Sequence, residues 1–526
     1  MYNAAEVVIR SSLLGAAMLA RVLSAGTSGI EAFIVECEVD VAAGLPASVV
    51  VGLPDAAVKE SRERTKAALT NSRYFYPPRR ITVNLAPADV KKEGPLFDLP
   101  IALGLVAATA QAEMPRLLRY AAVGELALDG TVRPVSGVLP MALAIRDEKL
   151  TGLVVPWENA PEAAVVHGID VIPVKTLAEA VGFLSGELAI PAVEADLDSI
   201  FHGDGRYDVD FADVKGQEHA KRALTVAAAG GHNILMIGPP GTGKTMLAKR
   251  LPTVLPPLTV EESLETTKVY SVAGLMDGKP LLATRPFRSP HHTISDAGLI
   301  GGGSNPRPGE VSLSHNGVLF LDELPEFKRK TLEVLRQPLE DGHVTIARAM
   351  HTVRYPGRFM LVASMNPCPC GYYTDSRREC RCTPHQIAQY RARISGPLLD
   401  RIDIHLDVPA IPYRTLSDKA PGTSSGEMAT LVHAARAAQS RRFEGRKIYS
   451  NAQMTTRDLK RHAGVDESSE ALLRHAMDTL SLSARAYHKI LKVARTIADL
   501  ANSDNIKQEH LLEAIQYRSL DREFVI

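Results

Sequence analysis

The stretch Gly238-Pro-Pro-Gly-Thr-Gly-Lys-Thr245 decides the fold of the second half of the chain. The apolar run Asn233-Ile-Leu-Met-Ile237 precedes it, and Met246-Leu-Ala-Lys-Arg250 follows it. This order predicts a strand, a loop and a helix. The complete GxxxxGK[ST] pattern in that setting predicts a loop that cradles the phosphates of a nucleotide.

Every residue of this loop is predicted to bind ATP: Gly238, Pro239, Pro240, Gly241, Thr242, Gly243, Lys244 and Thr245. The glycines let backbone N–H groups turn toward a polyphosphate, and the helix adds the positive end of its dipole at the same place. We expect Lys244 to reach the β and γ phosphates and the Thr245 hydroxyl to hold Mg²⁺.

Two further apolar runs end in polar side chains. Asn316-Gly-Val-Leu-Phe-Leu-Asp-Glu323 reads as a strand with two carboxylates, and we expect it beside the strand of the phosphate loop. Asp322 is predicted to hold Mg²⁺ through water and Glu323 to polarise the attacking water, the alternative being a buried strand with a solvated acidic end. Phe359-Met-Leu-Val-Ala-Ser-Met-Asn366 ends in an amide that can orient the same water or simply form a turn.

Two arginines are candidates for contact with the γ phosphate. Arg401, in Leu398-Leu-Asp-Arg-Ile-Asp403, is predicted at the end of a helix, where a neighbouring subunit's nucleotide can receive it. A trans arginine requires a ring, so Arg401 also carries a hypothesis of oligomerisation. Arg485 is predicted near the start of a late helix, where it either touches the phosphate or is a solvated surface residue.

Bulk properties restrict the class of protein. With 526 residues the chain is too long for one core, so two to four domains are expected. Lys and Arg number 60 and Asp and Glu number 60, which excludes a uniformly basic coat for nucleic acid but leaves local patches. No apolar run is long enough to span a bilayer. The apolar stretch 11–20 could pass for the core of a signal peptide, but Glu6 precedes it and no basic segment does. We expect a soluble cytoplasmic protein with no membrane partner.

Four of the five cysteines crowd into one short stretch: Cys368, Cys370, Cys380 and Cys382. Two CxC pairs at this separation can converge on a tetrahedral Zn²⁺, although CxC is tighter than the usual CxxC knuckle. The alternative is a set of reduced, unliganded thiols, and His385 is a spare ligand. Either fits a cytoplasmic protein better than a secreted disulfide framework.

Composition and periodicity divide the chain into segments. The predicted segments are an N-terminal extension over 1–20, a mixed α/β domain over 21–190, a linker over 191–212, an ATPase core over 213–412 and a helical region over 413–526.

Together these features resemble the AAA+ ATPases, in the branch that contains magnesium chelatase and the MCM helicases. Two insertions are similar to hairpins of that branch: a long segment that holds Arg285–Thr293 and Gly301–Gly309, and Gly342–Val353, which reads as two strands about a turn. In ring helicases of this kind both hairpins enter the central pore. The resemblance therefore makes Arg348 a candidate for contact with the DNA backbone.

The resemblance narrows to the YifB/ComM family of magnesium-chelatase-like proteins and covers nearly the whole chain from about residue 18. It is carried by Val51-Gly-Leu-Pro-Asp-Ala-Ala-Val-Lys-Glu-Ser-Arg-Glu-Arg64, Ala229-Gly-Gly-His-Asn233 and Arg288-Ser-Pro-His-His292. It implies an AAA+ core with a C-terminal helical lid, in a homo-hexamer that uses ATP to promote branch migration of DNA in natural transformation or recombination. Residues 1–17 have no counterpart and are either a tail or a start assigned upstream of Met18. The alternative functions are a chelatase motor with partner subunits and an ATP-dependent protease.

The N-terminal domain is similar to the proteolytic domain of Lon, which has the ribosomal S5 domain 2-like fold. Lon needs a serine after its Lys-Asp-Gly-Pro run and a lysine as base. Here Lys92-Glu-Gly-Pro95 is followed by Leu96, and Met141 stands where the lysine would be. The pair needed for peptidase chemistry is missing, so we expect a non-proteolytic scaffold.

Basic side chains also cluster at three places: Lys328-Arg-Lys330, Arg377-Arg378 with Arg381, and Arg441-Arg442 with Arg446-Lys447. Solvated surface is the more common role for such runs.

Overall fold

The computed structural model describes residues 18–203, 207–303, 306–347, 352–373, 375, 378–411, 422–446, 448–480 and 482–520. The chain forms two compact units. The first combines Met1–His202 with Thr267–Leu282, and the second combines Gly203–Thr266 with Ala283–Ile526. The sequence pattern did not indicate that Thr267–Leu282 belongs with the first unit.

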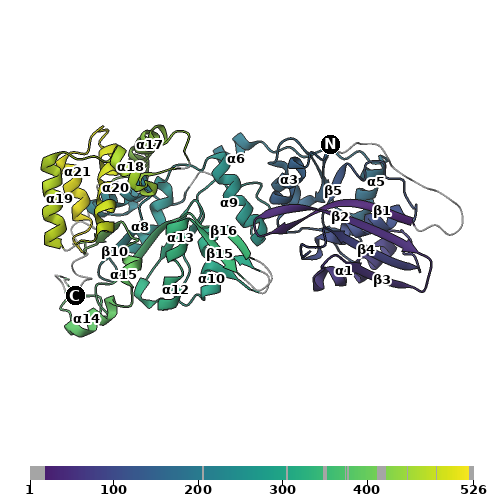
Figure 1. Cartoon of the computed structure of the whole chain (residues 1–526), viewed down its shortest axis with the longest axis horizontal. Coiled ribbons are helices and arrows are strands. Elements are labelled where there is room, and N and C mark those ends of the chain that lie inside the picture. The colour runs from purple at the N-terminus through teal and green to yellow at the C-terminus, as the bar shows by residue number, and fades with distance from the viewer. Residues whose placement is uncertain are drawn as a thin grey trace. The chain divides into compact units, whose positions relative to one another are not determined.

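The first unit is built on a seven-stranded sheet in the order β3-β4-β2-β1-β5-β8-β9 (Figure 1). Its strands are β1 (Met18–Ser28), β2 (Glu31–Ala42), β3 (Ala47–Val51), β4 (Arg80–Ala86), β5 (Tyr120–Ala122), β8 (Gly152–Pro156) and β9 (Asp170–Val174). Strand β2 is antiparallel to β1 and β4, whereas the remaining pairs are parallel. A separate antiparallel pair joins β6 (Glu125–Leu126) to β7 (Val132–Arg133).

Alternating burial explains why these segments form strands. From Val35 onward every second residue of β2 is buried, as expected of a strand with one face on a core. The helices of this unit are α1 (Ala56–Asn71), α2 (Asp98–Ala108), α3 (Val138–Asp147), α4 (Ala160–Ala164) and α5 (Leu177–Ser185). Helix α1 begins where the side chain of Asp55 accepts a hydrogen bond from Val58 N at 2.8 Å. Helix α2 packs so closely that a Cβ on Gly104 would lie 2.5 Å from Val39.

Two boundaries differ from those predicted. The predicted extension over 1–20 is wrong at its end, because β1 already begins at Met18 and pairs along its length with β2. The stretch interpreted as a linker contains the helix α6 (Leu197–Gly203). Its proline and aspartate content suggested a loop, but Asp196 accepts a hydrogen bond from Ser199 N at the helix start.

The second unit contains a five-stranded parallel sheet in the order β11-β14-β17-β10-β18. Its strands are β10 (Ile234–Ile237), β11 (Phe287–Arg288), β14 (Val318–Leu321), β17 (Met360–Met365) and β18 (Ile404–Asp407). The prediction that the acidic strand lies beside the strand of the phosphate loop is wrong, because β17 lies between β14 and β10. All residues of β10, β14 and β17 are buried, which makes them near-continuous apolar runs without the alternation that could order them.

Both predicted insertions contain paired strands. Strand β12 (Gly301–Gly302) is antiparallel to β13 (Arg307–Pro308). Strand β15 (His343–Ala347) is antiparallel to β16 (Thr352–Pro356), with His343 opposite Pro356 and Ala347 opposite Thr352. Arg348, the predicted DNA contact, lies outside the described residues.

Helices surround this sheet and continue into the C-terminal region. Those before the lid are α7 (Glu218–Gly230), α8 (Lys244–Arg250), α9 (Val260–Ala273), α10 (Asp296–Ile300), α11 (Glu310–Leu313), α12 (Arg329–Glu333), α13 (Arg336–Asp341), α14 (Pro384–Arg391) and α15 (Gly396–Leu399). The lid helices are α17 (Ser425–Arg442), α18 (Thr456–His462), α19 (Glu467–Leu480), α20 (Ala484–Leu500) and α21 (Gln508–Gln516). Figure 1 shows the lid helices, in yellow and olive, gathered together. One apolar core joins them to α7 and β10.

Within the described residues, the helices are too short or too polar for any of them to cross a bilayer.

Candidate ATPase site

The phosphate loop connects the carboxyl end of β10 to the start of α8. Gly241 and Gly243 have φ of 78° and 88°, a left-handed backbone that favours glycine. A Cβ on either would meet nothing within 4 Å, so the space above the loop is open. Gly238 is needed for a different reason, because a Cβ there would lie 2.2 Å from Val408 O.

Lys244 points its ammonium group into this loop. Its Nζ donates to Gly238 O at 2.7 Å and to Pro239 O at 2.9 Å. Burial lowers the pKa of Lys244 to about 8, against the opposing effect of Asp322 and Glu323. A buried cation with carbonyl partners fits a polyphosphate, which would supply the missing negative charge.

Thr245 and Asp322 face one another across the same space. The Thr245 hydroxyl donates to Asp322 Oδ2 at 2.8 Å, and the Ser364 hydroxyl donates to the other carboxylate oxygen. A hydroxyl and a carboxylate oxygen in contact suit Mg²⁺, which prefers oxygen ligands and keeps several waters. Ser364 was not predicted; its position within an otherwise apolar strand, two residues before Asn366, was the available signal.

Glu323 follows β14 in a left-handed conformation with φ of 53°. Its carboxylate is exposed, and its Oε2 lies 3.6 Å from His292 Nδ1. The imidazole of His292 in turn lies 4.1 Å from that of His291. The sequence showed these histidines only as a family signature, without a role.

Asn366 follows the carboxyl end of β17, the strand between β14, which leads to Asp322, and β10, which leads to Lys244. Its Oδ1 accepts a hydrogen bond from Lys244 Nζ at 3.3 Å. This contact exists because β17 separates β10 from β14, which is the strand order that the sequence did not reveal. The structure therefore brings together Lys244, Thr245, Asp322 and Asn366 within one chain.

Arg401 is far from this group. It precedes β18, whose first residue Ile404 pairs with Ile234 and whose last residue Asp407 pairs with Ile237, next to the phosphate loop. Arg401 thus lies beyond the amino ends of the strands, whereas the phosphate loop lies at their carboxyl ends, a separation of about 13 Å over four strand residues. There its guanidinium pairs with Glu340, and its carbonyl oxygen accepts from Asn233 Nδ2 at 3.0 Å. Within one chain Arg401 cannot serve the phosphates bound by Lys244.

Arg485 is the second residue of α20, as predicted. Its side chain is 65% exposed, and its Nη1 lies 3.8 Å from Asp400 Oδ2. No hydrogen bond in the described part of the chain joins Arg485 to the phosphate loop, so the two alternatives for this residue stay open.

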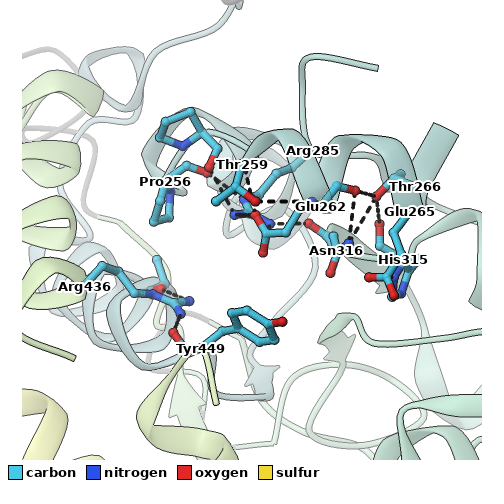
Figure 2. Close-up of polar contacts among 12 residues, drawn as sticks. Pro256, Thr259, Glu262, Glu265, Thr266, Arg285, His315, Asn316, Arg436 and Tyr449 are labelled. Carbon is cyan, nitrogen blue, oxygen red and sulfur yellow. Dashed lines mark hydrogen bonds and ion pairs between the residues drawn. The ribbon is translucent and has the colours of Figure 1, made fainter. Parts of the chain in front are cut away.

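Two half-buried arginines have structural roles (Figure 2). Arg285 donates to Glu262 Oε2 at 2.8 Å and to Asn316 O at 2.7 Å, which ties α9 to the loop before β14. Arg436 donates to Ala228 O at 3.0 Å and to Tyr449 O at 2.9 Å. Burial, with repulsion from Arg285, lowers the pKa of Arg436 to about 10.

The four clustered cysteines converge beside the phosphate loop. The Sγ atoms of Cys368, Cys370 and Cys380 are 3.4 to 3.7 Å apart, and all four Sγ atoms lie within 4.8 Å of one another. Four ligands about 2.3 Å from a tetrahedral Zn²⁺ lie about 3.8 Å from one another, so this geometry fits the ion. A Cβ on Gly371 would lie 2.7 Å from Pro240, which places the cysteine loop against the phosphate loop. His385 does not belong to this cluster.

The first unit has apolar side chains at the positions that correspond to Lon chemistry. Leu96 and Met141 are both buried. The neighbouring Lys92 is also buried, and its Nζ donates to Val90 O at 2.8 Å and to Pro87 O. The Lys92 ammonium is therefore occupied by hydrogen bonds to backbone carbonyl oxygens.

Known proteins share these features along almost their entire length. The competence protein ComM of Haemophilus influenzae is 46% identical over 506 residues, which cover 96% of this chain and 98% of ComM. YifB of Escherichia coli is 43% identical over 499 residues, 94% of this chain and 96% of YifB. The chain belongs to the YifB/ComM family of magnesium-chelatase-like proteins.

Family models described as magnesium chelatase subunit ChlI match this family member in three places: residues 37–159, 210–416 and, for the C-terminal part of that subunit, 422–518. More distant similarities are to the magnesium-chelatase 38 kDa subunit of Rhodobacter capsulatus, at 28% identity over 30% of this chain and 50% of that protein, and to Lon protease 2 of Bacillus subtilis, at 31% over 27% of each. Membership confirms the predicted fold, an AAA+ α/β core with a Lon-like domain and a helical C-terminal region. It also implies ATPase activity with ATP and Mg²⁺ as cofactors.

Proposed function

We propose that this family member is an ATP-driven DNA translocase that promotes branch migration in natural transformation or recombination. The observation that carries the proposal is the similarity, over 96% of this chain and 98% of the relative, to a protein named for competence. The paired strands β12–β13 and β15–β16 support it, because they occupy the insertions that resemble the pore hairpins of ring helicases. We place this activity in the cytoplasm.

The proposed active form is a homo-hexamer. Support comes from the position of Arg401, at the amino ends of the strands and therefore opposite to the phosphate loop. An arginine that cannot reach the phosphates of its own chain can act on those of a neighbour. In a closed ring every site would then receive one such arginine.

The first unit is proposed to be a scaffold for the ring. Leu96 and Met141 offer neither a nucleophile nor a base, and their burial fits a role in packing. Measurable peptide hydrolysis that a point change in this unit abolishes would contradict this part of the proposal.

The test is ATP turnover by the purified chain with and without forked or four-way DNA. We expect branched DNA to stimulate turnover and four-way junctions to be resolved only when ATP is hydrolysed. Turnover that DNA leaves unchanged, with no movement of a junction, would contradict the proposal.

A second candidate is a chelatase-type motor that drives metal insertion. It is favoured by the three family models, all of which describe a magnesium chelatase subunit. Such a motor should respond to partner subunits and a porphyrin instead of DNA, so the same turnover assay separates the two functions.

We also propose that the cysteine cluster holds Zn²⁺. The spacing of the four thiols supports it, and so does their place in a short stretch rich in polar residues, whose shape a bound metal can fix. The ion would stabilise a loop that contacts Pro240 and begins two residues after Asn366.

Elemental analysis tests this site. We expect about one Zn per chain, with the metal lost in Cys368→Ser and retained in Cys37→Ser, whose thiol is buried elsewhere. A metal-free protein that folds normally would refute the zinc proposal without affecting the proposed activity.

A further inference from the structure

The lid contains a pocket of about 420 Å³ that the ATPase site does not use. It lies between α17, α18 and α20, and the loop Asn502–Asn505 closes one side. Four arginines line it, against two aspartates: Arg441, Arg442, Arg461, Arg495, Asp499 and Asp504. In a chain with equal numbers of acidic and basic residues, this is a local excess of positive charge.

The carboxylate of Asp499 is already engaged with the two inner arginines of the pocket, Arg442 and Arg495. Arg442 donates to both oxygens of Asp499, at 2.8 and 2.5 Å, and Arg495 Nε donates to the same carboxylate at 3.0 Å. Arg495 also donates to the carbonyl oxygen of Asp504 at 2.6 Å. One carboxylate thus serves two guanidinium groups, and over its whole lining the pocket has four arginines against two aspartates, an excess of two positive charges.

The outer arginines have no such partner. Arg441 and Arg461 are both exposed, and neither forms an ion pair within the part of the chain that the structure describes. His462, which also lines the pocket, has its pKa lowered by burial and then by repulsion from Arg442 and Arg461. Two free guanidinium groups at the mouth of a cationic pocket suit a bidentate oxyanion such as phosphate.

A basic stripe leads away from the pocket along α18. Arg457, Lys460 and Arg461 are exposed, and their spacing of three and four residues puts them on one face of the helix. The acidic residue of this helix, Asp458, is buried and paired with Arg446. A free nucleotide would need only the pocket, whereas the stripe extends the positive charge as a polyanion requires.

We infer that this pocket and the α18 stripe bind phosphates of a nucleic-acid backbone. The inference rests on the proposed function, because it names a second contact surface for the same DNA. The sequence alone favoured solvated surface for the Arg441-Arg442 run. The fold places that run beside Arg461 of another helix, a proximity that no sequence pattern indicates.

Fluorescence anisotropy of a labelled single-stranded oligonucleotide with the full chain tests the inference. We expect Arg441→Ala/Arg461→Ala to weaken binding roughly tenfold or more at low salt. The slope of log affinity against log salt should fall by about 0.7 for each phosphate contact removed. Arg474→Ala is the matched control, since Arg474 is an exposed lid residue of α19 with no ion pair among the described residues.

Basal ATP turnover and thermal unfolding should be unchanged in both variants, because none of these residues belongs to the ATPase site. DNA affinity of Arg441→Ala/Arg461→Ala equal to that of Arg474→Ala would overturn the inference, as would weaker binding that follows loss of oligomers in light scattering. A Lys244→Ala chain could still bind ATP and lose that binding when Arg441→Ala/Arg461→Ala is added. That result would assign the pocket to free nucleotide and would also overturn the inference. A wild-type chain that binds no DNA would instead refute the proposed function, and the inference with it.

Discussion

The two units each resemble an enzyme domain, but only the second keeps the polar side chains that its chemistry requires. At the carboxyl ends of β10, β14 and β17, Lys244 donates a hydrogen bond to Asn366, and Thr245 donates one to Asp322. In the first unit, Leu96 and Met141 stand where Lon has its serine and lysine, and both are buried apolar residues. The comparison shows that resemblance of fold transfers a function only where the reacting groups are retained.

The two units also differ in the free energy of burying these side chains, which are charged or polar in the second unit and apolar in the first. Burial of Lys244 lowers its pKa to about 8, so without a polyphosphate beside it the ammonium charge is only partly compensated. Such groups persist where a ligand supplies the balance. Leu96 and Met141 carry no such penalty, and each stabilises the fold by roughly 1.5 to 3 kcal/mol through burial.

The comparison predicts that Glu323→Gln lowers ATP turnover by about 10²- to 10⁴-fold while ATP still binds. The amide keeps the shape of the side chain but cannot polarise the attacking water. Steady-state turnover and nucleotide binding on the same preparation measure the two effects. Glu326→Gln is the control, since Glu326 pairs with Arg393 at 3.0 Å and should retain most activity. Equal losses of ATP turnover in both variants would show that Glu323 has no special role in hydrolysis.

In the first unit, Met141→Lys should restore the side chain that Lon uses and yet produce no peptidase. The new ammonium would be buried without a partner, which costs about 3 to 5 kcal/mol of folding free energy. Denaturant unfolding of this variant and of Met141→Leu, expected to lose less than about 1.5 kcal/mol, measures the difference. Peptide hydrolysis by Met141→Lys would show that this unit retains a latent site.

The pH dependence of nucleotide binding gives a smaller effect. Below pH 8 Lys244 is protonated and its ammonium can pair with phosphate, whereas above pH 8 Lys244 of the nucleotide-free chain loses its proton and must regain it when ATP binds. ATP affinity should therefore fall as pH rises through 8, by at most about tenfold per pH unit. Isothermal titration from pH 7 to 9 measures this fall. Whatever affinity Lys244→Arg retains should vary less with pH, because its guanidinium stays protonated; an equal dependence would assign the titration to another group.

Much of the ATPase site was predictable because it depends on local pattern. The phosphate loop, the paired carboxylates and the strands β15 and β16 are each encoded within a few consecutive residues. The order of β14, β17 and β10 was not, because three equally apolar runs carry no information on which lies between the others. The contacts of Asp322 with Ser364 and of Arg401 with Glu340 join distant residues, and no periodicity indicates them.

The most direct test of the central claim mixes two inactive chains. Lys244→Ala cannot bind ATP, and Arg401→Ala lacks the arginine that we propose acts on a neighbour. Where the two chains meet in a ring, the phosphate loop of an Arg401→Ala chain receives Arg401 from a Lys244→Ala chain, which completes the site. We predict that DNA-stimulated ATP turnover, near zero for either chain alone, reappears on mixing. A mixture as inactive as its components, or full activity of Arg401→Ala alone, would contradict the account.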